Sequence, residues 1–325
     1  MGLSIRSSSW EDGMSNRTKA NSMTRVWFLT MLMAAGIASL AVSTTQTQGE
    51  RVVEVERLKD NLYVLRGGGG NSAAFVTSDG VVLIDTKVAG WGQPLLDRIS
   101  ELTTNPVTTI INTHTHFDHV SGNVEFPPSV DVVVHENTKS LLNEWNPVTG
   151  LGREPPNVFD TSGGQGMPTQ TFTDSLTLGS GADQVDLYYF GRAHTGGDAW
   201  VVFPSLRVMH AGDAFPGKQV PIMDANNGGS GVDYPGTLWN AYAGVPEIDT
   251  IITGHSTPMM RDDLREYATF VGAFVSAARS AKRDGFSAEE FARVWQVPPR
   301  FMGYRKPAPE RLQAYVQVVF DEIEE

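Results

Sequence analysis

The residues best suited to carry chemistry lie together in one short segment of the sequence. Residues 112–119 read Asn-Thr-His-Thr-His-Phe-Asp-His, which places His114, His116, Asp118 and His119 within six residues. Imidazole and carboxylate groups are typical zinc ligands, and they also suit iron or manganese. The segment therefore predicts a metal centre.

Three more candidate ligands follow later apolar runs of the chain. They are His194, Asp213 and His255. Each has a glycine within two residues, which allows another backbone to approach closely, as a crowded site requires. The two remaining histidines, His135 and His210, are expected to have structural roles and are left out of the site.

Short strands must position these side chains. Residues 107–112 form a β-branched run that leads directly into the histidine cluster, and strand side chains alternate between two faces. His114 and His116 thus point to one side, and the following turn brings Asp118 and His119 beside them. Further strands are expected at 52–56, 60–66, 73–77, 81–85, 130–134, 185–190, 199–203, 206–211 and 250–253.

Helices are predicted where apolar residues recur at helical spacing. They occupy 92–102, a stretch near 235–243 and most of the last seventy residues. Strands followed by a helix thus occur in each half of the chain, at 52–102 and 185–243. This order favours two layers of sheet with helices outside.

Two glycine-rich loops flank the candidate ligands and are candidates for a lid. Residues 146–170 contain five glycines and four prolines, and residues 216–233 contain the run Asn-Asn-Gly-Gly-Ser-Gly. A loop as long as the first is usually functional or mobile in a compact domain. A third run, Gly67–Gly70, either lines the site or forms a flexible turn, and we favour the turn.

The composition excludes several classes of protein. The 325 residues include no cysteine, so disulfides, thiolate-ligated metal sites and a cysteine nucleophile are impossible. Hydrophobic residues make up 40% of the chain, too many for a disordered acidic protein. The 37 acidic and 25 basic residues give a net charge of −12, which argues against binding to nucleic acid. We expect a small-molecule substrate as the partner, and the oligomeric state stays open.

The N-terminal segment has the order of a secretory signal. Basic residues within 1–25 precede an apolar run at 26–42, and small residues crowd the end of that run. We expect residues 1–41 to be removed near Ala41, which makes the mature protein periplasmic or secreted. The alternative is an uncleaved membrane anchor, although 17 residues are short for a span. Only this segment is expected to contact a membrane.

The pattern of candidate ligands resembles that of the metallo-β-lactamase superfamily. The motif His-x-His-x-Asp-His is complete at 114–119, and the later His, Gly-Asp and Gly-His follow in the family's order within residues 52–258. The resemblance implies an α/β fold, a four-layer αββα sandwich, with the site at one edge between the sheets. It also implies two zinc ions. Their ligands would be His114, His116 and His194 for the first ion and Asp118, His119 and His255 for the second, with Asp213 bridging both.

The resemblance also implies a reaction. We expect an exported zinc-dependent hydrolase, in which a metal-bound hydroxide attacks a small ester, lactone, thioester or amide, β-lactams included. Asp118 would orient this nucleophile or accept its proton. Thr195 and Asp198 are candidates to hold the ligand imidazoles. The absence of cysteine and the presence of Asp213 favour the relatives that hydrolyse esters, thioesters or lactones.

Two other functions stay open. The first is a mononuclear iron oxygenase resembling the persulfide dioxygenase branch. Its ligands would be His114, His116, His194 and Asp213 or a subset of them. The second is a non-catalytic metal-binding protein, although a ligand set with an open position weighs against a purely structural zinc site.

The expected domains are a catalytic domain at 50–260 and a C-terminal helical extension at 261–325. The extension covers one edge of the sandwich, either to bind substrate or only for packing. It carries a basic cluster, which we interpret as a solvated face. The cluster consists of Arg300, Arg305, Lys306 and Arg311.

Overall fold

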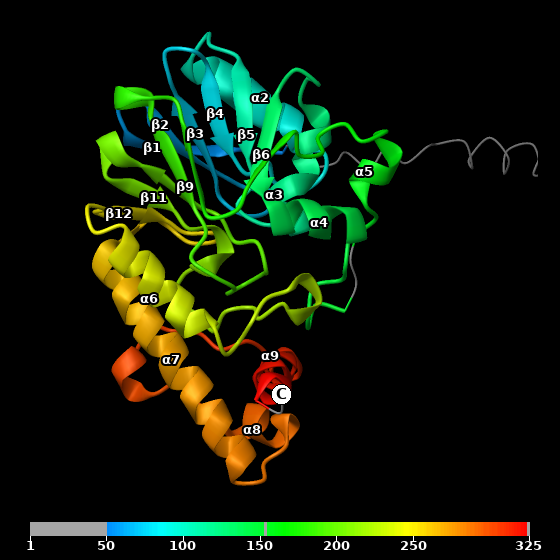
Figure 1. The fold of residues 1–325 in the computed structure, drawn as a ribbon, viewed down its shortest axis with the longest axis vertical. Helices are drawn as coiled ribbons and strands as arrows, with labels where there is room; N and C mark the ends of the chain where they lie inside the picture. Colours follow the sequence, from blue (N-terminus) through cyan, green and yellow to red (C-terminus); the bar gives the residue numbers. More distant parts are fainter. Residues whose placement is uncertain (1–50, 153–154, 324–325) are drawn as a thin grey trace, which may run out of the picture. The chain divides into compact units, whose positions relative to one another are not determined.

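The computed structural model describes residues 51–152 and 155–323, which belong to one compact unit. Within these residues the strands form two sheets (Figure 1). The first sheet has the order β1 (Glu54–Lys59), β2 (Leu62–Arg66), β3 (Ser72–Val76), β4 (Val81–Ile84), β5 (Val107–Ile111), β6 (Asp131–His135) and β7 (Gln170–Phe172). The second has the order β13 (Met259–Met260), β12 (Thr250–Ile252), β11 (Val208–His210), β10 (Trp200–Phe203), β9 (Val185–Tyr188) and β8 (Ser175–Leu178).

The two sheets pack face to face because apolar side chains alternate along their strands. In β4, Val82 and Ile84 join the core between the sheets, whereas Val81 and Leu83 belong to the core on the outer face. Phe75 of the first sheet meets Phe203 of the second, with ring centroids 5.0 Å apart. This contact lies in the centre of the sandwich.

Helices cover the outer faces of both sheets. Leu95 and Ile99 of α2 (Gly92–Leu102) pack on the first sheet. α6 (Tyr234–Gly244) and α7 (Arg261–Arg283) share a core with Trp200 and Met209 on the outer face of the second sheet. Figure 1 shows α2 on the opposite side of the sheets from α6 and α7. The predicted four-layer αββα sandwich with C-terminal helices is therefore confirmed.

The remaining helices are shorter or lie near the C-terminus. They are α3 (Phe117–Val120), α4 (Glu136–Glu144), α5 (Val158–Thr161), α8 (Ala288–Val294) and α9 (Pro309–Glu322). Several short elements have no counterpart among the predicted ones, namely α3, α4, α5, β7, β8 and β13. In α4 only Thr138 and Leu142 are buried, so its apolar pattern is weak, and in β7 only Phe172 is buried.

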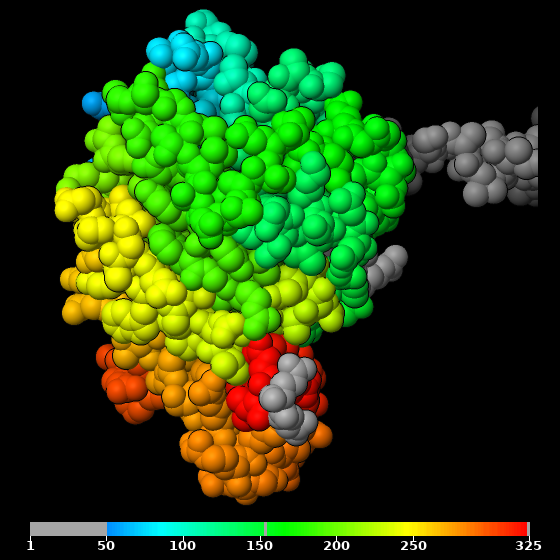
Figure 2. Space-filling model, in the orientation of Figure 1, coloured from blue at the N-terminus to red at the C-terminus, as the bar shows by residue number. Residues whose placement is uncertain are grey.

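The C-terminal extension shares its core with the sandwich. Leu264 and Phe274 of α7 lie in the same apolar cluster as Ile251 of β12 and Tyr315 of α9. The extension is also paired with the loop that follows β11, since the amide of Val220 donates to the carbonyl of Arg305 over 2.9 Å. In Figure 2 the red atoms of α9 lie against the yellow-green atoms of the loop that precedes α6, where Glu322 accepts from the amide of Val232.

The predicted export segment at 1–41 lies outside the described residues. Among the residues that are described, no helix combines the length and hydrophobicity that a membrane span needs.

Candidate metal centre

The seven candidate ligands all follow the ends of strands. β5 runs into His114 and His116, and the short helix α3 then presents Asp118 and His119. β11 and β12 are parallel neighbours, so the residues after them emerge at the same edge of the second sheet. Asp213 follows β11, His255 follows β12, and His194 lies in the loop between β9 and β10.

The structure brings the seven side chains together in two groups. Each group offers ligand atoms that lie within 4.8 Å of one another. One group contains His114, His116, His194 and Asp213, and the other contains Asp118, His119 and His255.

Asp213 lies between the two groups. Its Oδ2 is 3.7 Å from His194 Nε2 and 3.2 Å from His255 Nε2, and its Oδ1 is 3.5 Å from His119 Nε2. One carboxylate therefore reaches nitrogen atoms of both groups. This is the position that a bridging ligand needs.

Two buried atoms of the cluster have no hydrogen-bond partner among the described residues. They are His114 Nε2 and Asp213 Oδ1. Leaving such an atom unsatisfied costs about 1–3 kcal/mol. His116 Nδ1 and His194 Nε2 face each other at 3.0 Å, as two nitrogens aimed at one point. These unsatisfied and converging atoms fit a bound cation, which accepts lone pairs from all of them.

Glycines allow the chain to close around the cluster. A Cβ on Gly254 would lie 1.9 Å from Asp213 Oδ1, and a Cβ on Gly70 would lie 2.1 Å from Cε1 of His119. A Cβ on Gly69, whose φ is +122°, would lie 2.6 Å from the carbonyl oxygen of Asp118. Of the two roles considered for Gly67–Gly70, lining of the site fits the structure better than the favoured flexible turn, because Gly69 and Gly70 pack against Asp118 and His119.

Partners outside the cluster hold the imidazoles from behind. His119 Nδ1 lies 2.6 Å from Asp85 Oδ2, and His116 Nε2 lies 2.7 Å from Asp224 Oδ2. His194 Nδ1 lies 3.0 Å from the carbonyl oxygen of Ile222. With these nitrogens engaged, the other nitrogen of each ring points into the cluster. Such partners orient metal ligands and raise their basicity.

The predicted role of Thr195 and Asp198 is wrong. Asp198 accepts hydrogen bonds from the amide and hydroxyl of Thr195, and it shapes the loop after His194 without bonding an imidazole. Asp85 directly follows the apolar run of β4, as the ligands follow their strands, so its position at a strand end could have marked it in the sequence. Asp224 lies in an aperiodic loop, and no sequence signal marked it.

The sequence matches the model of the metallo-beta-lactamase superfamily over residues 65–255. The chain belongs to this superfamily. The match spans β3 to β12, both glycine-rich loops and all seven candidate ligands.

Individual relatives of this superfamily member are distant. Metallo-beta-lactamase type 2 of Elizabethkingia meningoseptica is 25% identical over 239 residues, which cover 69% of this chain and 86% of that protein. The 2,4-dinitroanisole O-demethylase subunit alpha of Nocardioides sp. (strain JS1661) is 23% identical over 272 residues. The aligned residues cover 80% of this chain and 74% of that protein.

Solved metallo-beta-lactamases share the fold. One from Pontibacter korlensis has 20% sequence identity and a TM-score of 0.57, and the match covers 68% of this chain and 99% of that one. DIM-1 metallo-beta-lactamase has 16% sequence identity and a TM-score of 0.56, and the match covers 68% of this chain and 97% of that one. About a third of this chain lies outside each match.

Burial and neighbouring charges shift the pKa values of the clustered ligands in opposite directions, and His116, whose pKa is raised, differs from His114 and His194 of its own group. Burial, and then the neighbouring imidazoles, hold the pKa of His114 well below its usual value and lower the pKa of His194 to about 4. Burial opposes charge on His119 as well, but three surrounding carboxylates raise its pKa well above the usual value. The pKa of Asp213 is well below its usual value because His255 and His119 outweigh burial. Neutral imidazoles and an ionised carboxylate are the forms that bind a metal ion.

The second group forms the open side of this metallo-beta-lactamase-type centre. The side chains of His255 and Asp118 are 35% and 19% exposed, whereas those of the first group are buried. A substrate would thus approach over Asp118 and His255.

The two flanking loops contact each other beside the centre. Asn226 Nδ2 donates to the carbonyl of Pro147 over 2.8 Å, and the amide of Thr149 donates to Asp224 over 2.9 Å. Asp224 in turn holds His116, so both loops are tied to the ligands. Their predicted action as a lid stays a prediction.

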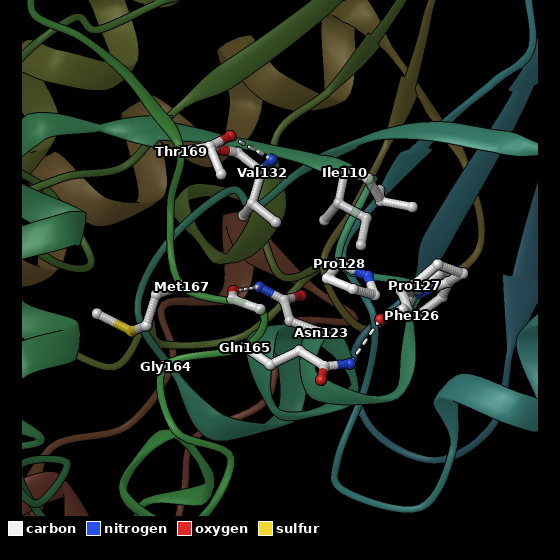
Figure 3. A pocket seen from close by; sticks show the side chains of 12 residues that line it. Ile110, Asn123, Phe126, Pro127, Pro128, Val132, Gly164, Gln165, Met167 and Thr169 are labelled. Atoms are coloured by element: carbon white, nitrogen blue, oxygen red, sulfur yellow. Dashed lines mark hydrogen bonds between the residues drawn. The ribbon is translucent and has the colours of Figure 1, made fainter.

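A separate cavity of about 160 Å³ lies where the 146–170 loop returns to the first sheet (Figure 3). Gln165 Nε2 donates to the carbonyl of Phe126, and Asn123 Nδ2 donates to that of Gly166. No candidate ligand lines this cavity. Its polar groups fasten the end of the loop.

Proposed function

We propose that the chain is a metal-dependent hydrolase that acts on a small ester, lactone, thioester or amide, β-lactams included. Membership in the metallo-beta-lactamase superfamily supports this proposal. The observation that carries it is the position of Asp213, whose carboxylate reaches nitrogens of both ligand groups. We propose two zinc ions, because imidazole and carboxylate ligands without thiolate suit zinc.

The residues of the chain have distinct tasks in this reaction. Zinc ions in the two groups would supply a water of lowered pKa and a positive charge near the attacked oxygen. Asp118, which is partly exposed and has Oδ2 3.4 Å from His255 Nε2, would accept the proton of the attacking water at Oδ2. Asp85 and Asp224 keep the rings of His119 and His116 in place.

A second candidate is the removal of a methyl group from an aromatic ether. It is favoured by the similarity to the 2,4-dinitroanisole O-demethylase subunit, which covers 80% of this chain, against 69% for the β-lactamase relative. An iron oxygenase remains a related alternative, with one metal ion in the first ligand group.

Metal analysis and a substrate panel test these proposals together. We expect about two zinc ions per chain and hydrolysis of at least one member of a panel of esters, lactones, thioesters, β-lactams and 2,4-dinitroanisole. His116→Ala should abolish turnover, whereas His135→Gln should retain it, because His135 lies outside both ligand groups. One iron per chain with oxygen uptake would contradict the hydrolase.

We also propose that the protein is exported, which the order of residues 1–42 supports. The mass of the protein recovered from the periplasm of an expression host tests this. We expect a chain that has lost residues 1–41, and a full-length chain in the cytoplasm would contradict export.

A further inference from the structure

Three residues of the C-terminal basic cluster line a cavity of about 230 Å³. They are Arg305, Lys306 and Arg311, which meet Ile222 and Tyr315 there. The interpretation of the whole cluster as a solvated face is therefore incomplete. Arg305 and Arg311 are exposed, yet they converge on one hollow at the junction of the extension and the loop after β11.

Main-chain contacts fix the position of this cavity. The amide of Arg305 donates to the carbonyl of Lys218 over 3.0 Å, and the amide of Val220 donates back to the carbonyl of Arg305. The ammonium group of Lys306 donates to the carbonyl of Trp295 over 2.8 Å. The main chain of Arg305 and the ammonium group of Lys306 are thus held in place before any ligand arrives.

The positive charge of the cavity is not neutralised by the protein. Among the described residues, no carboxylate forms an ion pair with Arg305, Lys306 or Arg311, although the whole chain has a net charge of −12. Arg305 has only the amide oxygen of Gln219 at 3.3 Å. Three unpaired cations around one hollow attract an anion.

A buried hydroxyl provides a second, independent sign of a ligand. Tyr315 lines the cavity and is 1% exposed, and its hydroxyl has no hydrogen-bond partner among the described residues. A buried tyrosine hydroxyl usually has a partner. An anion that enters the cavity deeply enough to meet this enclosed hydroxyl would accept its hydrogen bond.

The cavity shares a wall with the candidate metal centre. Ile222 lines the cavity, and its carbonyl accepts the hydrogen bond of His194 Nδ1. Asp224, two residues later, holds His116. A ligand in the cavity thus lies against the segment that positions two imidazoles of the centre.

We propose that this cavity binds an anionic carboxylate or phosphate group. Guanidinium groups bind both through paired hydrogen bonds. The group is either the charged end of the substrate or a separate small anion. The first source rests on the proposed hydrolase function, whereas binding of the anion itself does not.

Calorimetric titration of the metal-loaded protein with inorganic phosphate and with succinate tests the proposal. Arg311→Gln should weaken binding by about tenfold or more, as the loss of a charge-assisted hydrogen bond implies. The matched control Arg300→Gln should not, because Arg300 belongs to the same basic cluster but does not line this cavity. His116→Ala should bind both probes as the unaltered protein does. Equal binding by Arg311→Gln, loss of binding in His116→Ala, or no binding at all would overturn the proposal.

Kinetics with two matched esters, one neutral and one carrying a carboxylate, distinguish the sources of the anion. If the cavity holds the charged end of the substrate, Arg311→Gln should raise KM for the carboxylate ester alone. If it holds a separate anion, phosphate should change the turnover of both esters in the unaltered protein and of neither in Arg311→Gln. If no ester is hydrolysed, the proposed function fails, while the titration still decides whether the cavity binds an anion.

Discussion

His119 donates a hydrogen bond from Nδ1 to Oδ2 of Asp85 over 2.6 Å, and both side chains are buried. The same carboxylate accepts from the amide of Thr113 over 2.8 Å and from its hydroxyl over 2.7 Å. One aspartate thus joins the ends of β4 and β5 and leaves Nε2 of His119 free to face the cluster.

Replacing this aspartate should weaken the second ligand group. In Asp85→Asn an amide NH2 group, which donates and does not accept, takes the place of one carboxylate oxygen, so at least one of the three hydrogen bonds is lost. We expect the affinity for metal to fall by roughly 10- to 100-fold, as for other partners of metal ligands. Titration with zinc against a competing chelator measures it. The control Asp186→Asn changes a buried aspartate that bonds Thr177 on β8, and zinc affinity should not change.

Replacing Asp224 should weaken metal binding by the first ligand group. Asp224 accepts from His116 Nε2 and, through Oδ1, from the amide of Thr149. We expect Asp224→Asn to lower the affinity of the first ligand group for zinc by a similar factor. The affinity of the second ligand group should stay largely unchanged. Spectroscopic titration with cobalt(II) in place of zinc follows the two sites separately. Identical titration curves for Asp85→Asn and Asp224→Asn would contradict the claim that each aspartate supports a different ligand group.

Gly254 should tolerate no side chain. A Cβ at this position would lie 1.9 Å from Asp213 Oδ1, so Gly254→Ala must displace the carboxylate between the two groups. We expect loss of at least one bound metal ion and of turnover. Gly236→Ala is the matched control, since a Cβ there meets no atom within 4 Å. It should retain full metal content, and because Gly236 lies in α6 it should gain up to about 1 kcal/mol of stability.

Lys87 should make stability depend on pH. Its side chain is fully buried, and its ammonium group donates to the carbonyls of Leu65 and Gly70. Burial lowers its pKa from 10.5 to about 7, although Asp85 and Asp118 act in the opposite direction. Between these two values the unfolded chain binds more protons than the folded chain. The free energy of unfolding should therefore rise with pH, by up to about 1.4 kcal/mol per unit for this group.

Urea unfolding of the metal-free protein at pH 7, 8 and 9 measures this effect. Lys87→Met has no proton to exchange, so the stability of the unaltered protein relative to the variant should increase over this range. Parallel pH profiles for the two proteins would show that Lys87 does not titrate as expected.

The ligands were predictable because each follows a strand end, and the three later ones, His194, Asp213 and His255, also have a glycine within two residues. His114 and His116 directly follow the β-branched run of β5, and α2 matched its predicted bounds because its apolar residues recur at helical spacing. What escaped prediction depends on contacts between distant segments. Asp224 approaches His116 across 108 residues of sequence. Tyr315 belongs to an amphipathic stripe that predicts only core packing, and its unpartnered hydroxyl emerges from the folded structure alone.

The pairing of Val220 with Arg305 has a consequence for when the centre can form. The segment that positions His194 and His116 pairs with Arg305, which is synthesised after all seven candidate ligands. A growing chain therefore carries its ligands long before it can arrange them around an ion. If the chain is exported in an unfolded state, metal loading takes place after translocation, and the metal supply of the destination compartment decides which ion the protein receives.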